Sequence, residues 1–315
     1  MKSKTIVVCF LGILCFTVPL FAKEGGDQYP NGAESWGAGI LPPPNTFAVL
    51  DYFTVYGGDL KDGSGNTVTV GGKSASVFAV ADAFRPVFMS KLKLFGGQVG
   101  WYTVIPVVYQ SVTLGSRETK GGIGDITVMP FMLAYHFPNK GLHFAVVTDV
   151  NLPTGHFDGS DPRTSIGAGS VGIEPAFALT YLPKPGWEAS TKLHYHIATR
   201  NSTTDYTSGQ DFHADYLIGK HIGQWGIGAN GYILKQTTDD RQYGQVVAAV
   251  PGMWDTGRRG QVFAIGPNVN FASKRGFQFM AGYMHETLVR NRFGGDKLMV
   301  KIIVPTQLSL FPKGK

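Results

Sequence analysis

The chain alternates between apolar and polar residues over many short segments. In the segment 187–200, Ala189 and Leu193 fall on one face, whereas Lys192 and His194 fall on the other. Such period-two alternation is typical of a β-strand that has one apolar and one polar face. Segments of about this length are also what a tilted strand needs to cross a membrane.

Twelve such segments follow residue 45, and together they predict an all-β protein. They are 46–56, 75–89, 94–110, 126–137, 142–152, 171–181, 187–200, 212–222, 225–236, 261–271, 277–288 and 298–311. The apolar face repeats from strand to strand, since Phe144 and Phe177 stand opposite Asp149 and Glu174. We therefore predict a transmembrane antiparallel β-barrel of about twelve strands, with apolar faces toward lipid and polar faces toward the lumen.

The predicted connections alternate in length. Short turns are expected at 138–141, 182–186, 223–224 and 273–276. Long polar connections are expected at 57–73, 111–122, 154–168, 201–210 and 237–260. Short periplasmic turns and long external loops are typical of outer-membrane barrels, whereas the alternative of a soluble β-sandwich needs no such rhythm. With an even number of strands, both termini are expected on the periplasmic side.

Six prolines fall within or beside the predicted strands. They are Pro86, Pro106, Pro130, Pro175, Pro267 and Pro305. A proline cannot donate to the hydrogen-bond ladder, and a closed barrel has no free edge to accommodate it. We expect bulges or kinks there, one of which could open a lateral gap in the wall. The alternative is that these prolines mark strand ends.

The N-terminus has the pattern of a secretory signal peptide. Lys2 and Lys4 precede an apolar run at 5–16, and a small residue, Ala22, precedes the polar Lys23. A single membrane anchor is the alternative, but the run is short for a span. The predicted organisation is a signal peptide at 1–22, an N-terminal periplasmic or plug segment at 23–45, an outer-membrane barrel at 46–311 and a tail at 312–315. The predicted location is the bacterial outer membrane.

Composition narrows the chemistry. The only two cysteines, Cys9 and Cys15, lie in the signal, so the mature chain has no thiol and a cysteine-based metal site or nucleophile is excluded. Without Lys2 and Lys4, 26 basic residues face 22 acidic ones, a formal charge of +4. This mild excess without a basic cluster predicts no nucleic-acid partner. No cofactor is predicted.

Polar residues on the predicted inner faces are candidates for lining the lumen. A base at the midplane of the lipid face costs about 2–4 kcal/mol, so charges are placed inward. These candidates are Asp149, Glu174, Lys192, His194, His196, Arg200, Asp215 and Glu286. They can form a satisfied network that holds the wall together, or they can bind solute. Their mixed signs argue against a strongly anion-selective pore.

Two further features of the inner faces have alternative interpretations. His194 and His196 share a face, but two ligands do not make a metal site and no third can be named, so no metal is predicted. The apolar candidates Tyr232, Met280 and Met284 suit a lumen that binds hydrophobic solutes, because methionine adapts to varied shapes. Their alternative role is to pack against a plug formed by residues 23–45.

Several short motifs carry a resemblance to a known family. They are Pro42–Pro44 before the first strand, Gly-Ile-Gly-Asp at 122–125 with Pro130, Leu-Pro-Thr-Gly at 152–155, residues 201–206 with Gly209, Gly231 and Tyr232 with Gln236, Asp239 and Asp240, Ile-Gly-Pro at 265–267, and Glu286. In order and spacing they resemble the family of outer-membrane proteins named after the meta-pathway of phenol degradation. The resemblance implies an outer-membrane barrel that passes hydrophobic, often aromatic, small molecules.

Passive uptake of hydrophobic, aromatic solutes is therefore the function expected, with the solute and outer-membrane lipid as partners. One alternative is a lipid hydrolase or deacylase embedded in the outer membrane, because Ser190 and His194 share a strand face. Another is a structural barrel without transport. No catalytic residue is predicted, and the sequence leaves the solute and the oligomeric state open.

Overall fold

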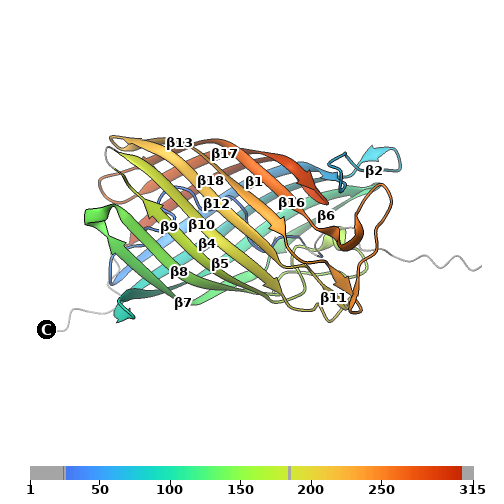
Figure 1. The fold of residues 1–315 in the computed structure, drawn as a ribbon, viewed down its shortest axis with the longest axis horizontal. Helices are drawn as coiled ribbons and strands as arrows, with labels where there is room; N and C mark the ends of the chain where they lie inside the picture. The colour runs from blue at the N-terminus through green and yellow to red at the C-terminus, as the bar shows by residue number, and fades with distance from the viewer. Residues whose placement is uncertain (1–23, 25, 184–185, 307–315) are drawn as a thin grey trace, which may run out of the picture.

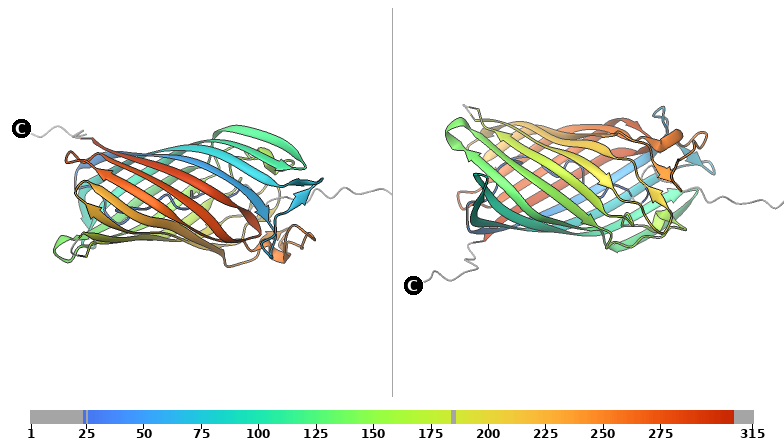
Figure 2. Two further views of the ribbon diagram at one scale, coloured as in Figure 1. Left: turned by 90° about the horizontal axis from the view of Figure 1, so that it is seen from above. Right: turned by 60° about the horizontal axis from the view of Figure 1, so that its bottom comes forward.

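The protein folds as a closed antiparallel β-barrel (Figures 1 and 2). The computed structural model describes residues 24, 26–183 and 186–306. Its wall strands are β1 (Thr46–Lys61), β4 (Ser76–Leu94), β5 (Gly97–Leu114), β7 (Ile126–Phe137), β8 (Leu142–Leu152), β9 (Gly172–Tyr181), β10 (Trp187–Ala198), β12 (Asp211–Ile222), β13 (Trp225–Gln236), β16 (Gln261–Ala272), β17 (Gln278–Arg290) and β18 (Arg292–Thr306). Because β1 pairs with both β4 and β18, the cylinder closes. The predicted transmembrane barrel of about twelve strands is confirmed.

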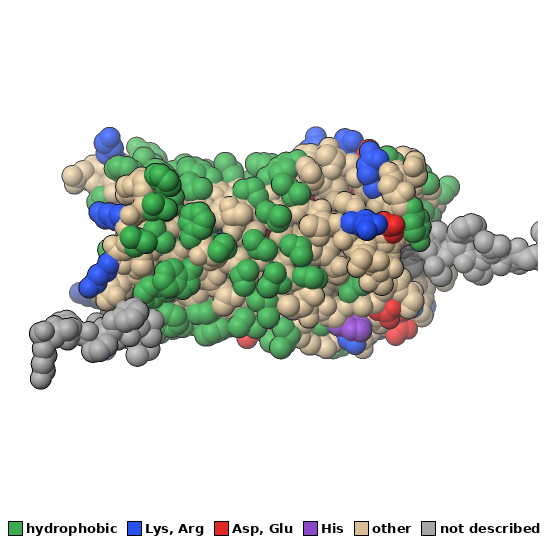
Figure 3. Space-filling model, turned by 90° about the horizontal axis from the view of Figure 1, so that it is seen from below, with side chains coloured by type: hydrophobic (Ala, Val, Ile, Leu, Met, Phe, Trp, Pro, Cys, Tyr) green, Lys and Arg blue, Asp and Glu red, His purple; other side chains and the backbone are tan. Residues whose placement is uncertain are grey.

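Strand alternation produces the two faces of the wall. On β10, Leu193 points outward and is exposed, whereas Lys192 and His194 are buried inside the barrel. Figure 3 shows hydrophobic side chains gathered in a broad band on the outer surface, with charged side chains mainly near the two ends. Among the described residues, no helix is long and apolar enough to cross a membrane.

The two ends of the barrel differ, as the connection lengths predict. At the short-turn end, η1 (Pro138–Lys140) ends at Gly141, whose φ of 60° suits glycine. The opposite end, called the long-loop end below, carries small elements: β2 (Thr69–Val70), β3 (Lys73–Ser74), η2 (Pro162–Thr164), β11 (Tyr206–Thr207), β14 (Arg241–Gln242), β15 (Gln245–Val246) and η3 (Thr256–Arg258). One connection there is short, since β17 and β18 are joined through Asn291 alone.

The long polar loop predicted at 111–122 is wrong. Strand β5 continues to Leu114, turns at Gly115 and returns as β6 (Ser116–Ile123), which pairs with β5. The segment looks like a polar loop because Val112 and Leu114 alternate with polar residues. In the structure, both are buried in a small apolar cluster with Leu60 at the long-loop end. The cluster holds β5 extended beyond the barrel wall.

The expected proline bulge occurs at Pro130. Both partners of β7 change register here: the pairing with β5 shifts between Gly100 and Tyr102, and the pairing with β8 shifts between Val128 and Met132. One residue of β7 is therefore extra on both sides, as in a β-bulge. Pro175 and Pro267, by contrast, lie in continuous register opposite Thr148 and Ala229.

Residues 26–45 run back through the lumen, so the start of the described chain does not lie where it was expected. The first and last strands do meet at the short-turn end, where Phe47 pairs with Thr306. Glu24, however, lies at the long-loop end, where Asn201 Nδ2 and Thr204 Oγ1 donate hydrogen bonds to its carboxylate. An extended stretch of about twenty residues can span some 65 Å, which is more than the length of a wall strand.

Several predicted features lie outside the described residues. These are the signal peptide at 1–22 with its cleavage after Ala22, the last part of the final strand at 307–311, and the tail at 312–315.

Candidate functional site

The structure places most of the candidate lumen residues inside the barrel. Buried there are Asp149, Glu174, Lys192, His194, His196, Asp215, Tyr232, Met280, Met284 and Glu286. Arg200 is different and does not line the lumen. Strand β10 ends at Ala198, and the Arg200 side chain is 64% exposed beyond it, paired with Asp205 at 2.9 Å.

The N-terminal segment, residues 24 and 26–45, is bound to the wall through Asp215. This carboxylate accepts hydrogen bonds from Tyr29 Oη at 2.7 Å, from the Gly32 amide at 2.7 Å and from the Glu34 amide at 2.9 Å. Three donors satisfy a carboxylate that has no contact with bulk water. Asp215 therefore fixes the central part of the segment to β12.

A second attachment is an ion-pair cluster. Glu34 lies between Arg85 on β4 and Lys301 on β18, with nitrogen-to-oxygen distances of 2.6 Å to each. The Arg85 guanidinium also lies 3.8 Å from the centre of the Tyr102 ring. Because all these groups are buried, breaking the cluster leaves a charge without compensation, which is costly in a site of low dielectric constant.

Met280 and Met284 pack against the N-terminal segment. Ser35 Oγ lies 3.8 Å from Met280 Sδ, and a Cβ added at Gly32 would meet the Met284 side chain within 2.9 Å. Close by, Trp36 Nε1 donates to Asn268 at 2.7 Å. The structure therefore favours the alternative in which these methionines support a plug over the one in which they contact solute.

A cavity of about 380 Å³ lies between the N-terminal segment and the wall. Small apolar side chains from the inner faces of β4 and β5 line one side of it: Val77, Ala79, Ala81, Ala83, Val104 and Val108. The polar lining includes Arg85, Tyr52 and Tyr102. Arg85 Nε is buried and has no hydrogen-bond partner among the described residues.

Comparisons with known proteins place this barrel in a family. The family described as "Putative MetA-pathway of phenol degradation" matches residues 57–302. The chain belongs to this family. A comparison with curated proteins found no match.

Two solved structures resemble this family member to different degrees. The COG4313 outer membrane channel from Pseudomonas putida F1 superposes with a TM-score of 0.69 at 11% identity, covering 86% of this chain and 98% of that one. The translocator domain of the autotransporter NalP from Neisseria meningitidis gives 0.45 at 10% identity, over 85% and 90% of the two chains. At such identities the first likeness shows the shared fold.

Several of the motifs that carry the resemblance to this family meet in two clusters at the long-loop end. Asp125, from the first motif, accepts hydrogen bonds from Gln28 Nε2 at 2.7 Å, the Gly155 amide at 3.0 Å and the Ala168 amide at 2.9 Å. It therefore joins two family motifs to the N-terminal segment. The sequence motifs marked Asp125, but nothing in them pointed to Gln28.

The second motif cluster surrounds Asp240. Its carboxylate accepts hydrogen bonds from Tyr206 Oη, from the Gly209 amide at 2.6 Å and from Gln236 Nε2 at 2.7 Å. Burial raises the pKa of Asp240 to about 7, although these hydrogen bonds oppose the rise. The cluster ties together the long connections at 199–210 and 237–260.

The serine and histidine that suggested a hydrolase have different partners. Ser190 Oγ donates to Glu188 Oε1 at 2.6 Å and lies 2.8 Å from Thr180 Oγ1, whereas His194 Nδ1 contacts Glu174 at 2.6 Å. Nucleophilic catalysis needs the serine and its base within hydrogen-bond reach of each other. The arrangement therefore gives the hydrolase alternative no support.

Proposed function

We propose that this protein is an outer-membrane channel for the passive uptake of hydrophobic, mainly aromatic, small molecules. In this proposal the protein arrives in the outer membrane after its signal peptide is cleaved near Ala22. The observation that carries the proposal is the cavity beside the N-terminal segment. Ligand sites are typically concave and mostly apolar, with a few polar groups that fix orientation. The lumen cavity has this composition, whereas a water-filled general porin has a polar lumen throughout.

The size and chemistry of the cavity suit one or two aromatic rings. An apolar cavity of about 150 Å³ is enough to bind benzene, and this one measures about 380 Å³. The alanines at 79, 81 and 83 leave room for a flat ring beside the wall. Arg85 and Tyr52 offer polar atoms at the edge of the cavity, so a ring with one polar substituent, such as a phenol, fits the lining.

The solute would reach the cavity from the long-loop end. The straight path onward to the short-turn end is occupied by residues 26–45. A sideways path is the more direct one, because β6 pairs with β5 alone among the described strands, whereas the ladder between β7 and β8 ends at Ile126 and Leu152. Gly124 and Ile166 line the cavity here: the Gly124 amide donates to Pro106 O at 2.9 Å, and Ile166 approaches Gly124 by contact, outside any strand ladder.

The test is uptake by whole cells with and without the protein. Labelled phenol and toluene are compared with a sugar of similar size, and folded protein in the outer membrane is verified by its heat-dependent gel mobility. The proposal expects faster and saturable uptake of the aromatics without a change for the sugar. Equal uptake of both aromatics with folded protein present would sink the proposal, and an equal gain for the sugar would indicate a general pore.

A further inference from the structure

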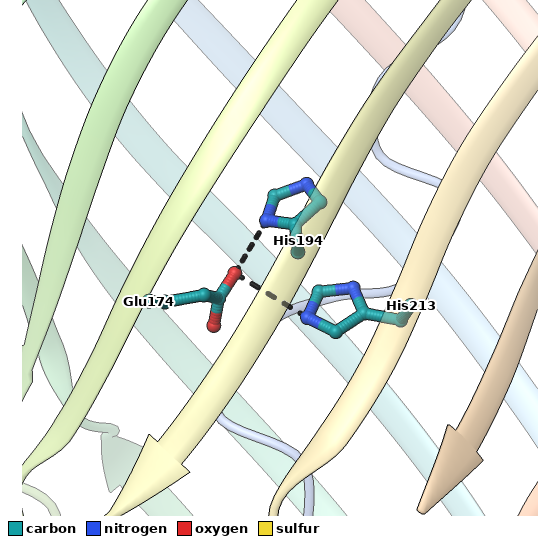
Figure 4. Close-up of side chains that lie close together, drawn as sticks. All are labelled: Glu174, His194 and His213. Atoms are coloured by element: carbon teal, nitrogen blue, oxygen red, sulfur yellow. Dashed lines mark hydrogen bonds and ion pairs between the residues drawn. The ribbon is translucent and has the colours of Figure 1, made fainter. Parts of the chain in front are cut away.

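Three ionisable side chains converge inside the barrel, and one of them, Glu174, also lines the cavity. Glu174 on β9, His194 on β10 and His213 on β12 point toward one another (Figure 4). His194 and His213 stand directly opposite in the strand register, and Glu174 reaches them from the next strand. Its Oε1 atom lies 2.6 Å from His194 Nδ1 and 3.4 Å from His213 Nε2.

Hydrogen bonds within the trio do not satisfy its polar atoms. All three side chains are at most 2% exposed. Glu174 Oε2, His194 Nε2 and His213 Nδ1 have no hydrogen-bond partner among the residues that the structure describes. Buried polar atoms are nearly always paired, so three such atoms in one cluster call for a water molecule or an ion as their partner.

We propose that Glu174, His194 and His213 form a binding site for a divalent transition-metal ion of the Zn²⁺ type. One ligand atom from each residue lies within 4.8 Å of the other two. Two imidazoles and one carboxylate are a donor set that zinc uses in proteins, whereas Mg²⁺ and Ca²⁺ prefer oxygen ligands alone. The cavity reaches Glu174, so water can fill the remaining coordination position.

The charges around the trio are compatible with a bound cation. Asp211 and Asp215 flank His213 on the same buried face of β12. The nearest base on β10, Lys192, lies 3.4 Å from Asp149, which offsets its charge. The site is therefore not dominated by positive charge, although the protein as a whole is basic.

Binding requires both rings to turn out of their stacked arrangement, because the lone pair of each nitrogen lies in the plane of its ring. The two imidazoles are stacked at 15° with their centres 4.3 Å apart, and rotation about χ2 turns their nitrogens toward one ion at about 2.0–2.1 Å. Tyr29 covers them, with ring centres 4.3 Å from His194 and 5.0 Å from His213. A bound ion would therefore link three wall strands beneath the N-terminal segment and stabilise the barrel by mass action.

The test uses Co²⁺ and Zn²⁺ on the full-length mature protein in detergent, without a polyhistidine tag. We expect one Co²⁺ per chain with the visible absorption of a low-coordinate nitrogen and oxygen site, displaced by Zn²⁺ and unaffected by Mg²⁺. Glu174→Gln, His194→Gln and His213→Gln should each weaken binding at least tenfold. His221→Gln is the matched control, because His221 forms a similar pair with buried Glu188 at 2.7 Å, and among the described residues no second imidazole completes a three-ligand group there.

Folding of each variant is checked by heat-dependent gel mobility, and thermal unfolding with and without Zn²⁺ gives a second readout. A rise in the unfolding temperature that the three trio variants lose and His221→Gln keeps supports the site. No stoichiometric binding by folded wild-type protein, or equal binding by the trio variants, overturns it. Loss of binding in His221→Gln alone would place the ion elsewhere and also overturn it.

Discussion

Glu34 Oε1 accepts a hydrogen bond from Arg85 Nη1 at 2.6 Å, which ties the N-terminal segment to the inner wall of β4. Glu34→Gln keeps the size of the side chain but leaves two buried bases without their counter-charge. Removing one partner of a buried pair typically costs about 3–5 kcal/mol. We expect the segment to loosen and the lumen to open more often, seen as higher conductance in planar bilayers.

The control for this experiment is Glu118→Gln, the same change at a carboxylate that is 43% exposed on β6. It should leave the conductance unchanged. Wild-type conductance in a folded Glu34→Gln protein would contradict the view that this ion pair holds the segment in the lumen.

The cluster around Asp240 should make the connections at the long-loop end sensitive to pH. Its pKa is about 7 in the folded protein, whereas an ordinary Asp has 3.8, so the folded state holds this proton more tightly. The free energy of opening the cluster should fall by about 1.4 kcal/mol per unit as pH rises from about 4 to 7, and then level off. Hydrogen exchange at 199–210 and 237–260 measures it.

Asp240→Asn should remove this dependence, because the amide keeps its size and remains uncharged throughout. The prediction would be contradicted if hydrogen exchange in the wild type, corrected for intrinsic rates, became slower as the pH rises, because the free energy of opening would then increase with pH.

Asp51 and Asp82 carry carboxyl groups that face outward on neighbouring strands of the wall. Asp82 on β4 and Asp51 on β1 are diagonal neighbours, because Asp82 pairs with Phe53 and Asp51 pairs with Phe84, and both phenylalanines are exposed. An acid on the lipid face destabilises a barrel, by less than the roughly 2–4 kcal/mol of a base. Asp82→Asn keeps a hydrogen-bonding side chain and removes a charge, so it should raise the free energy of unfolding in lipid by about 1 kcal/mol. Denaturant titration in lipid vesicles measures it.

Asp59→Asn, near the long-loop end of β1, is the comparison and should give no such gain. A less stable Asp82→Asn protein would mean that the acid pair has a partner other than lipid.

The sequence predicted the barrel well because alternation acts locally and repeats twelve times. It predicted the lumen less well. By alternation along the chain, Arg200 should face inward with Lys192 and His194. It is exposed because strand β10 ends at Ala198, before Arg200 is reached. Val112 and Leu114 were hidden among polar residues, so the β5–β6 hairpin was missed.

The contacts of the N-terminal segment could not be predicted at all. Glu34 meets Lys301 across more than 260 residues, and Tyr29 meets Asp215 across more than 180. No local pattern encodes such pairs. A usable signal did exist for the cavity, since Ala79, Ala81 and Ala83 alternate on one face of β4, where small residues leave space.

The central claim is that aromatic solutes pass through the cavity beside β4, and filling it is the most direct test. Ala81 lines the cavity, whereas its neighbour Val80 faces outward. Uptake of labelled phenol into proteoliposomes should fall at least tenfold in Ala81→Phe and stay at the wild-type level in Val80→Phe, with both barrels folded. Undiminished uptake by folded Ala81→Phe would contradict the account.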